Sequence, residues 1–435
     1  MINSLALRDE VAIWHPFTKQ YNKAQPIAIT KAKDSILYDE NNNEYIDAIS
    51  SWWVTLHGHA NEFIAQKIYE QALTLEQVIF AGFTHKPAVE LAEKLLQLLP
   101  NNFAKIFYSD NGSTSVEVAI KMALQYWANE NTAHENSNGL NVNHQRKKIL
   151  AFNNSYHGDT FGGMSVSDRS VFTAAFKDYL FDVVFIDVPT KSNIKDSITM
   201  LQQQGSHFAA FIYEPLVQGA GGICMYDAMY LDELLKAAKA QDIICIADEV
   251  MTGFGRTGKF FASEYTTQKP DIICLSKGLT GGTMALGVTA CTLKIYDAFV
   301  SNNVYKTFFH GHSFTANPLA CTSAIASLVL FSKNNTLEKV QWISSQHQLF
   351  VEKQHLKTQQ KLYKNLRCLG TILAFEISSG KDEYLNNVAQ IITQKSLENG
   401  IYIRPLGNTV YIMPPYCITE SELFKVYAFL EHLMY

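Results

Sequence analysis

Short runs of apolar, often β-branched residues alternate along the chain with longer amphipathic stretches. The apolar runs occupy residues 105–109, 148–152, 183–188, 208–213, 243–247, 272–275 and 286–291. Residues 115–126 and 228–240, in contrast, have the apolar spacing of helices. Strands that are apolar throughout are buried on both faces, and their alternation with helices is typical of a mostly parallel, covered sheet. The pattern therefore predicts an α/β fold, with a large domain at residues 55–325.

The two ends of the chain follow a different pattern. Residues 26–50 alternate between apolar and polar positions around a polar turn, which predicts a hairpin. The C-terminal part begins with a long helical stretch, and strand candidates follow at 370–377 and 401–413. We expect the two ends, residues 1–54 and 326–435, to meet in one smaller α+β domain, with the large domain inserted between them.

Two polar segments interrupt the alternation. Residues 129–148 are rich in asparagine and follow no period, and residues 190–206 show a weaker form of this composition. Such segments are typical of exposed loops. The sequence therefore predicts loops at both places, and it assigns no function to the first.

Charge and hydropathy exclude several classes of protein. The 435 residues include 36 Lys and Arg against 41 Asp and Glu, so the net charge is −5 and a general nucleic-acid binder is not expected. No run approaches the roughly 18 apolar residues of a membrane span, and the N-terminus lacks the pattern of a signal peptide. The seven cysteines are scattered without a CxxC pair, so we expect reduced thiols and neither disulfides nor a metal site. These features predict a soluble cytoplasmic protein that binds neither nucleic acid nor a membrane.

The candidate chemistry lies at the ends of two predicted strands. The run 243–247 is followed by Asp248 and a glycine-rich turn, and the run 272–275 is followed by Ser276 and Lys277. Ligands of open α/β sheets bind at the carboxyl ends of the strands. A buried lysine is costly while it is charged, and a Schiff base with an aldehyde cofactor removes that charge. A lysine and a carboxylate in these places suit pyridoxal phosphate, although a capping aspartate and a surface lysine are the simpler alternatives.

Two further segments offer contacts to such a cofactor. Gly112 and Ser113 lie between a predicted strand and helix, where a glycine, a hydroxyl and a helix N-terminus can hold a phosphate. The alternative is a plain capping box. Tyr156 follows another strand and could stack on a planar ring, although an aromatic residue in such a loop more often serves packing.

A third segment, residues 307–318, contains Gly311 and Ser313 before a helix that we expect to begin near Pro318. Glycine and serine there offer a further phosphate contact. The alternative is a simple turn that leads into the helix.

These segments, in this order and spacing, resemble the class III pyridoxal-phosphate aminotransferases of fold type I. The resemblance runs over nearly the whole chain. It is carried by WHP at 14–16, SSWW at 50–53, KMALQYW at 121–127, YHGDT at 156–160, TGFGRTG at 252–258 and RPLG at 404–407. The first three segments are similar to the branch that aminates 8-amino-7-oxononanoate to 7,8-diaminononanoate in biotin biosynthesis. The resemblance implies a large domain with a mostly parallel seven-stranded sheet and pyridoxal 5'-phosphate as cofactor.

The resemblance also implies a role for each candidate residue. Lys277 would be the Schiff-base lysine and the acid–base group of catalysis. Asp248 would pair with the pyridinium nitrogen, and Tyr156 would stack on the ring. Gly112 and Ser113 would hold the phosphate.

Other residues would act at the edge of the site. Gly311 and Ser313 would reach the phosphate of the neighbouring subunit's cofactor, so the resemblance implies a homodimer with active sites at the subunit interface. Trp52 would line the substrate pocket together with Phe17 and Gly311. Arg404 would bind the substrate carboxylate; its alternative is a surface arginine before a proline.

The residues leave the amino donor open. Phe17 and His312 resemble a variant branch that uses lysine, whereas the SSWW segment and Gly112-Ser113 look like the branch that uses S-adenosylmethionine. We expect S-adenosylmethionine, with lysine as the alternative, and we assign no role to His312. Another class III ω-aminotransferase, of the ornithine or 4-aminobutyrate type, and a non-catalytic binding protein are the remaining alternatives.

Overall fold

The computed structural model describes residues 4–21, 24–130, 145–358, 360–378 and 388–435. Its centre is a seven-stranded sheet in the order β4-β12-β11-β10-β7-β5-β6. The strands are β4 (Phe103–Ser109), β5 (Lys148–Phe152), β6 (Val183–Ile186), β7 (Phe208–Tyr213), β10 (Ile244–Asp248), β11 (Ile272–Leu275) and β12 (Gly287–Thr292). β12 pairs antiparallel with both β4 and β11, and the other strand pairs of this sheet are parallel. Each predicted apolar run forms one strand, and the predicted α/β fold with a mostly parallel sheet is confirmed.

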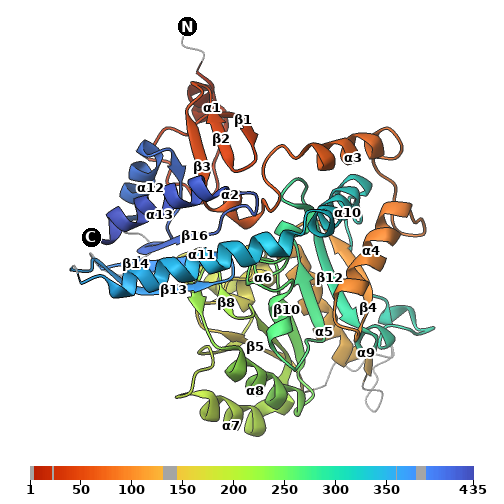
Figure 1. Ribbon diagram of the computed structural model, residues 1–435. Helices are drawn as coiled ribbons and strands as arrows, with labels where there is room; N and C mark the ends of the chain where they lie inside the picture. The colour runs from red at the N-terminus through yellow and green to blue at the C-terminus, as the bar shows by residue number, and fades with distance from the viewer. Residues whose placement is uncertain (1–3, 22–23, 131–144, 359, 379–387) are drawn as a thin grey trace.

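Helices cover both faces of this sheet (Figure 1). The helices of this part of the chain are α3 (Glu62–Ala72), which packs on α10, and α4 (Lys86–Leu98), α5 (Gly112–Glu130), α6 (Phe161–Val166), α7 (Ile194–Gln204), α8 (Ala228–Lys239), α9 (Leu293–Asp297) and α10 (Pro318–Lys333). Alternate residues of one strand join different cores: in β10, Cys245 and Ala247 pack in the core that includes α8, whereas Ile244 and Ile246 pack in the core that includes α5. This double burial explains why the strands are apolar at every position.

The two predicted loops have different outcomes. The prediction for residues 190–206 is wrong, because α7 occupies most of this segment. Ile194, Ile198 and Leu201 follow the i, i+4, i+7 spacing of a helix, and both Ile194 and Leu201 are buried. Most of the asparagine-rich segment, residues 131–144, lies outside the described residues.

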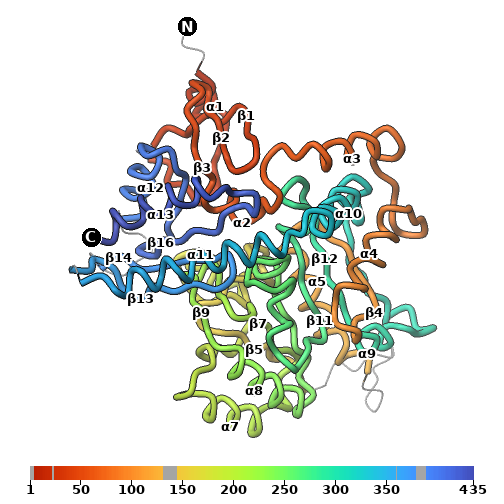
Figure 2. The backbone as a smooth tube through the Cα atoms, in the orientation of Figure 1, coloured from red at the N-terminus to blue at the C-terminus, as the bar shows by residue number. Residues whose placement is uncertain are grey.

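The two ends of the chain lie side by side, the red and the blue segments in Figure 2. The N-terminal strands are β1 (Ile29–Lys33), β2 (Ile36–Asp39) and β3 (Glu44–Asp47), and β15 (Ile401–Tyr402) pairs in parallel with β3. A second sheet contains β13 (Tyr363–Leu369), β14 (Ile372–Ile377) and β16 (Thr409–Ile412). The helices of the two ends are α1 (Leu5–Ala12), α2 (Ser50–Trp53), α11 (Thr336–Leu356), α12 (Val388–Glu398) and α13 (Glu420–Met434). A small hairpin, β8–β9 (Val217–Gln218 and Cys224–Met225), lies in the middle of the chain.

The expected C-terminal strand at 401–413 is in fact two strands. Its first part, β15, pairs with β3, whereas its last part, β16, pairs with β14 in the other sheet. The segment between them contains Pro405 and a positive φ of 58° at Gly407, which turns the chain from one sheet to the other. The division of the chain into domains at residues 55 and 325 stays a prediction.

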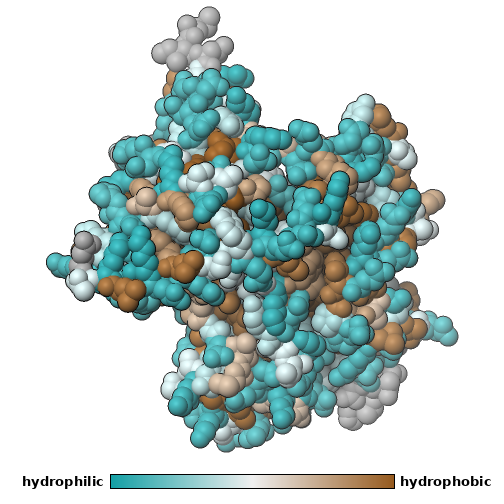
Figure 3. Space-filling model, viewed as in Figure 1, coloured by the Kyte–Doolittle hydropathy of each residue, from teal (hydrophilic) through white to brown (hydrophobic). Residues whose placement is uncertain are grey.

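The surface in Figure 3 is largely hydrophilic, with apolar residues scattered over it. Among the residues that the structure describes, no helix combines the length and the hydropathy needed to cross a membrane.

Candidate active site

A cavity of about 470 Å³ opens where several strands of the large sheet end. Five residues predicted from the sequence line it: Gly112, Ser113, Tyr156, Asp248 and Lys277. They come from segments that are far apart in the sequence, from the start of α5 to the residues after β11. The fold brings them together at the carboxyl edge of the sheet, which is where ligands of parallel sheets bind. The other residues that line the cavity are Trp53, Asn111, His157, Gly158, Asp159, Thr160, Glu214, Val250 and Met251.

Asp248 is the last residue of β10, and its carboxylate is fixed by two contacts. Oδ2 lies 2.7 Å from Nδ1 of His157, and Oδ1 accepts a hydrogen bond of 3.1 Å from the N–H of Val250. The His157 side chain is fully buried, and its other ring nitrogen, Nε2, has no hydrogen-bond partner among the described residues. The histidine therefore orients the carboxylate, which lines the cavity as a fixed negative charge.

Lys277 lies two residues beyond β11 and begins the short 3-10 helix Lys277–Thr280. Its φ of 47° is in the left-handed region. Non-glycine residues rarely adopt this conformation, and those that do tend to lie at functional sites. Nζ lies 4.4 Å from the centre of the Trp53 ring. Burial lowers the pKa of Lys277 to about 8, although the carboxylates of Asp248 and Glu214 act to raise it. The neutral, nucleophilic amine is therefore far more populated near neutral pH than in an ordinary lysine.

Glu214 is a residue of the cavity that the sequence analysis missed. Oε1 accepts a hydrogen bond of 3.0 Å from the N–H of Tyr156, and Oε2 accepts one of 2.8 Å from the N–H of Gly219. Burial raises the pKa of Glu214 to about 7; His157 lowers it and the charge of Asp248 raises it further. The signal was available, because Glu214 follows the apolar strand β7 as Lys277 follows β11.

The first turn of α5 forms a cup for an anion. A Cβ atom on Gly112 would lie 2.6 Å from Cγ1 of Val250, so only glycine fits this position. The hydroxyl of Ser113 lies 2.8 Å from that of Thr160 and accepts a hydrogen bond of 3.0 Å from the N–H of Thr160. The first N–H groups of a helix lack helical acceptors and carry partial positive charge, so they suit a phosphate.

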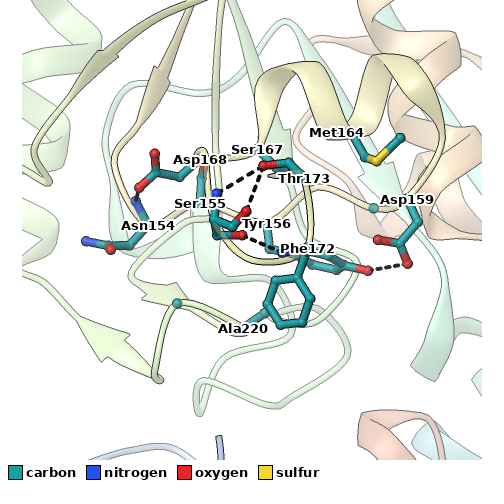
Figure 4. A pocket seen from close by; sticks show the side chains of 13 residues that line it. Asn154, Ser155, Tyr156, Asp159, Met164, Ser167, Asp168, Phe172, Thr173 and Ala220 are labelled. Carbon is teal, nitrogen blue, oxygen red and sulfur yellow. Dashed lines mark hydrogen bonds between the residues drawn. The ribbon is translucent and has the colours of Figure 1, made fainter. Parts of the chain in front are cut away.

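Tyr156 lines this cavity and also a smaller one of about 60 Å³, which Figure 4 shows. Its hydroxyl donates a hydrogen bond of 2.8 Å to Asp159, and its ring lies 6.3 Å from that of Phe172, edge to face. Two carboxylates therefore fix Tyr156: Glu214 binds its backbone N–H, and Asp159 binds its hydroxyl.

Arg404, Trp52 and Phe17 do not line the Lys277 cavity, but a series of ring contacts leads from them to it. The Arg404 guanidinium lies 4.8 Å from the Trp52 ring centre, and Trp52 meets Phe17 at 5.4 Å. Phe17 in turn lies 5.8 Å from Phe172, the neighbour of Tyr156. The tryptophan in the Lys277 cavity is the adjacent Trp53, which the sequence analysis did not single out.

An unusual backbone turn directs the side chains of the adjacent Trp52 and Trp53 to different places. Ser50, Ser51, Trp52 and Trp53 all have positive φ, between 45° and 77°, so α2 is a left-handed turn. Left-handed conformations cost a residue with a Cβ atom roughly 1–2 kcal/mol each. The result of this turn is that Trp53 faces Lys277 while Trp52 faces Arg404.

Gly311 and Ser313 lie in a different cavity of about 580 Å³, together with His312. Residues from the segment before α4, Gln77, Ile79, Phe80 and Ala81, and Phe107 of β4 form another part of its wall. Within one chain, therefore, the structure does not bring Gly311 and Ser313 to Lys277. In the part of the chain that the structure describes, no group of three or more His, Cys, Asp or Glu side chains could hold a metal ion.

Comparison with known proteins extends these observations to nearly the whole chain. The family model described as aminotransferase class-III matches residues 17–434. The adenosylmethionine-8-amino-7-oxononanoate aminotransferase of Synechococcus elongatus is 44% identical over 97% of this chain and 98% of its own.

Two solved structures are also similar. A crystal structure of adenosylmethionine-8-amino-7-oxononanoate aminotransferase from Methanocaldococcus jannaschii has a TM-score of 0.91 and 33% identity, covering 99% of this chain and 98% of that one. A PLP-bound amine transaminase from an uncultivated Pseudomonas species has a TM-score of 0.86 and 27% identity, covering 97% and 98%. With the lysine, the aspartate and the anion cup in one cavity, these matches show that the chain belongs to the class III aminotransferases.

Proposed function

We propose that this chain transfers an amino group to the keto carbon of 8-amino-7-oxononanoate, giving 7,8-diaminononanoate for biotin biosynthesis, with pyridoxal 5'-phosphate as cofactor. The observation that carries this proposal is the convergence of Lys277, Asp248 and the Gly112-Ser113 cup in one cavity. The relative with 44% identity over 97% of the chain bears the name of this reaction, which supports the choice of substrate.

The cavity fits the cofactor in each of its chemical groups. The aldehyde group needs an amine with which it can form a Schiff base, and Lys277, whose pKa is lowered, supplies that amine. A basic ring nitrogen needs a fixed carboxylate, which the His157–Asp248 pair supplies. A phosphate needs N–H donors and a hydroxyl, which the first turn of α5 supplies. Pyridoxal 5'-phosphate, when bound, provides a carbonyl that takes up the amino group and a ring that withdraws electrons.

The chain's own residues would do three things during transfer. Lys277 would hold the cofactor in the resting enzyme and, once displaced by a substrate amine, would move a proton to and from a substrate carbon through Nζ. Asp248 would hold the ring nitrogen in its protonated form. Trp53 would shield the Lys277 amine from water on one side, where its ring already lies 4.4 Å away.

Recognition of the keto acid would fall to Arg404 and the rings beside it. A guanidinium binds a carboxylate with two parallel hydrogen bonds. Trp52 and Phe17, which are in contact at 5.4 Å, provide apolar surface for a methylene chain. A substrate with a carboxylate at the end of a long aliphatic chain matches this combination.

The amino donor in this proposal is S-adenosylmethionine, and a single-turnover measurement tests it. The enzyme is loaded with pyridoxal 5'-phosphate, and the absorbance of the bound cofactor is followed after S-adenosylmethionine or lysine is added separately. Loss of absorbance with S-adenosylmethionine alone is expected. Loss with lysine alone would reassign the donor, and no loss with either would move the chain to another branch of the class III enzymes.

The variant Phe17→Tyr sharpens the donor measurement. Phe17 is 46% exposed and touches Trp52 and Phe172, so a hydroxyl can be added without filling a closed core. We expect the variant to change the rate with the donor far more than the rate with the keto acid. Equal changes in both rates would remove Phe17 from donor selection.

We also propose that the enzyme is a homodimer in which Gly311 and Ser313 complete the partner's site. Large apolar side chains near these residues, Ile79, Phe309 and Phe314, are each more than 60% exposed in the single chain, as surfaces for association often are. A Cβ atom on Gly311 would meet only Thr315, at 3.7 Å, so Gly311→Leu has room within its own chain.

Mixing two inactive variants tests the shared site. Lys277→Ala lacks the reactive amine, and Gly311→Leu should block the partner's site. Random exchange of subunits forms heterodimers with one intact site each and should restore about a quarter of the wild-type activity, because a two-fold interface pairs each site with the other chain. No restoration after exchange would mean that each chain builds its site alone.

A cytoplasmic location is part of the same proposal. All seven cysteines are free thiols, and Cys245, Cys274, Cys291 and Cys321 are buried. Unpaired thiols in this number are typical of proteins that function in a reducing compartment.

A further inference from the structure

The left-handed turn Ser50–Trp53 is tied to one buried carboxylate, that of Asp47. Asp47 is the last residue of β3, and its side chain is inaccessible to solvent. Its Oδ2 accepts a hydrogen bond of 2.8 Å from the hydroxyl of Ser51 and lies 2.9 Å from Nε2 of His59. Its Oδ1 accepts a hydrogen bond of 3.3 Å from the N–H of Ile49. One carboxylate therefore joins the residue before the turn, a residue within it and a residue after it.

Other contacts fix the remaining parts of the turn to the C-terminal half of the chain. The hydroxyl of Ser50 donates a hydrogen bond of 2.7 Å to the carbonyl of Met413, and Nε1 of Trp53 donates one of 3.0 Å to the hydroxyl of Tyr411. Ser51 lacks such a contact to the C-terminal half among its described hydrogen bonds, and Asp47 is its side-chain partner. Ser51 is thus the residue whose left-handed backbone depends most directly on Asp47.

The same strand pair delivers the turn and the arginine to one place. Asp47 of β3 is paired with Tyr402 of β15, and Arg404 follows two residues later. Because β3 and β15 are parallel, the segments after them leave the sheet at the same edge. The handedness of the turn then decides whether the Trp52 ring meets the Arg404 guanidinium, as it does at 4.8 Å, or faces elsewhere.

We propose that Asp47 is a positioning residue for substrate recognition: it holds Ser51 in the left-handed conformation that sets Trp52 against Arg404. This inference rests on the proposed function, because it assigns Arg404 and Trp52 to the substrate's carboxylate end. Asp47 itself does not line the Lys277 cavity, so the role proposed for it is an indirect one that passes through the turn.

Asp47→Ala is the first test. The KM for 8-amino-7-oxononanoate should rise about tenfold, while kcat with the amino donor stays within about twofold, because Lys277 and Asp248 come from other strands. The near-UV circular dichroism of the cofactor-free protein, which reports the fixed tryptophan rings, should weaken. An unchanged KM and an unchanged spectrum in a folded variant would overturn the proposal.

Asp39→Ala provides a matched control. Asp39 lies in the same sheet, is 6% exposed and accepts hydrogen bonds from Asn41, Asn43 and Tyr45. It has no hydrogen bond to the turn Ser50–Trp53. The control should lower the melting temperature but leave the KM and the tryptophan spectrum unchanged; an equal rise in KM would reduce the role of Asp47 to general stability.

The double variant Asp47→Ala, Ser51→Gly separates positioning from stability. Glycine adopts a φ of 45° without a Cβ penalty, and the Ser51 hydroxyl has already lost its acceptor in the single variant. The second change should therefore bring KM and the spectrum back toward wild type. Failure to recover either one would show that Asp47 acts in some way other than through the turn.

Two further measurements keep the outcome decisive. If Asp47→Ala does not fold, Asp47→Asn retains the shape and one acceptor oxygen and should give a smaller change in the same direction; no change would count against the proposal. Turnover of 8-amino-7-oxononanoate by the wild-type enzyme tests the proposed function separately, and no turnover would overturn that function. The near-UV spectra of the cofactor-free variants would still show whether Asp47 holds the turn.

Discussion

The site has a chemical end and a recognition end, and the two are built in different ways. At the chemical end, Lys277, Asp248 and Glu214 each follow or end a strand of one sheet. The charge of Asp248 acts to raise the pKa of both Lys277 and Glu214, and Glu214 acts to raise that of Lys277. At the recognition end, Trp52 and Arg404 come from opposite ends of the chain, and the segments that carry them follow the paired strands β3 and β15. A fixed sheet edge thus places the groups proposed to react, whereas the meeting of the two chain ends places the residues proposed for substrate choice.

The largest expected effect is at the chemical end. Lys277→Ala should abolish turnover, because no other lysine is among the described residues that line the cavity. The variant would lose both the proposed covalent hold on the cofactor and the group proposed to move the proton. The absorbance of the bound cofactor should disappear as well. Absorbance spectra and a turnover assay with 8-amino-7-oxononanoate check this expectation.

Lys239→Ala is the matched control for that variant. Lys239 is also partly buried and pairs with a carboxylate, Asp271 at 3.1 Å, but it lies at the end of α8, outside the cavity. The control should keep both the absorbance and the turnover. A Lys277→Ala enzyme that retained either property would show that the chemical end lies elsewhere.

The second effect is smaller and confined to the recognition end. Arg404→Ala should raise the KM for the keto acid by tenfold or more, because truncating one partner of a buried charge pair costs about 2–5 kcal/mol and Arg404 is only half-buried. The cofactor absorbance should stay intact. Arg404→Lys keeps the charge but loses the two parallel hydrogen bonds of a guanidinium, so its KM should lie between those of the wild type and Arg404→Ala. Equal KM values in the wild type and both variants would mean that Arg404 does not bind the keto acid.

The same contrast explains what the sequence could predict. Asp248 and Lys277 are visible because a polar residue directly after a buried strand is a local signal. Glu214 carries the same signal, with glycines at 219, 221 and 222 after it, and the sequence analysis nevertheless missed it. The contacts of Trp52 depend on a left-handed backbone and on a distant strand, and no local pattern contains either. The split of residues 401–413 into two sheets was missed for the same reason: pairing is decided by partners far away in the chain.

The smallest expected effect is a shift in pH dependence within the chemical end. In the proposed mechanism the neutral form of Lys277 attacks the aldehyde, and burial lowers the pKa of this lysine to about 8. The rate of pyridoxal 5'-phosphate uptake by the cofactor-free enzyme should therefore rise with pH and level off above about 8. Glu214, with a pKa raised to about 7, is mostly ionised there, and its charge acts to raise the pKa of Lys277.

Glu214→Gln removes that charge and should move the midpoint of the uptake profile to lower pH by less than about one unit, since burial, the larger cause, remains. Glu233→Gln, on the exposed face of α8, should leave the midpoint in place. Glutamine can accept from only one of the two N–H groups, those of Tyr156 and Gly219, that Glu214 binds. A shift toward higher pH would mean that the loss of the other hydrogen bond reopens the cavity to water, because renewed solvation favours the ammonium form. The direction of this small shift therefore tells whether Glu214 acts on the lysine by its charge or by holding the cavity closed.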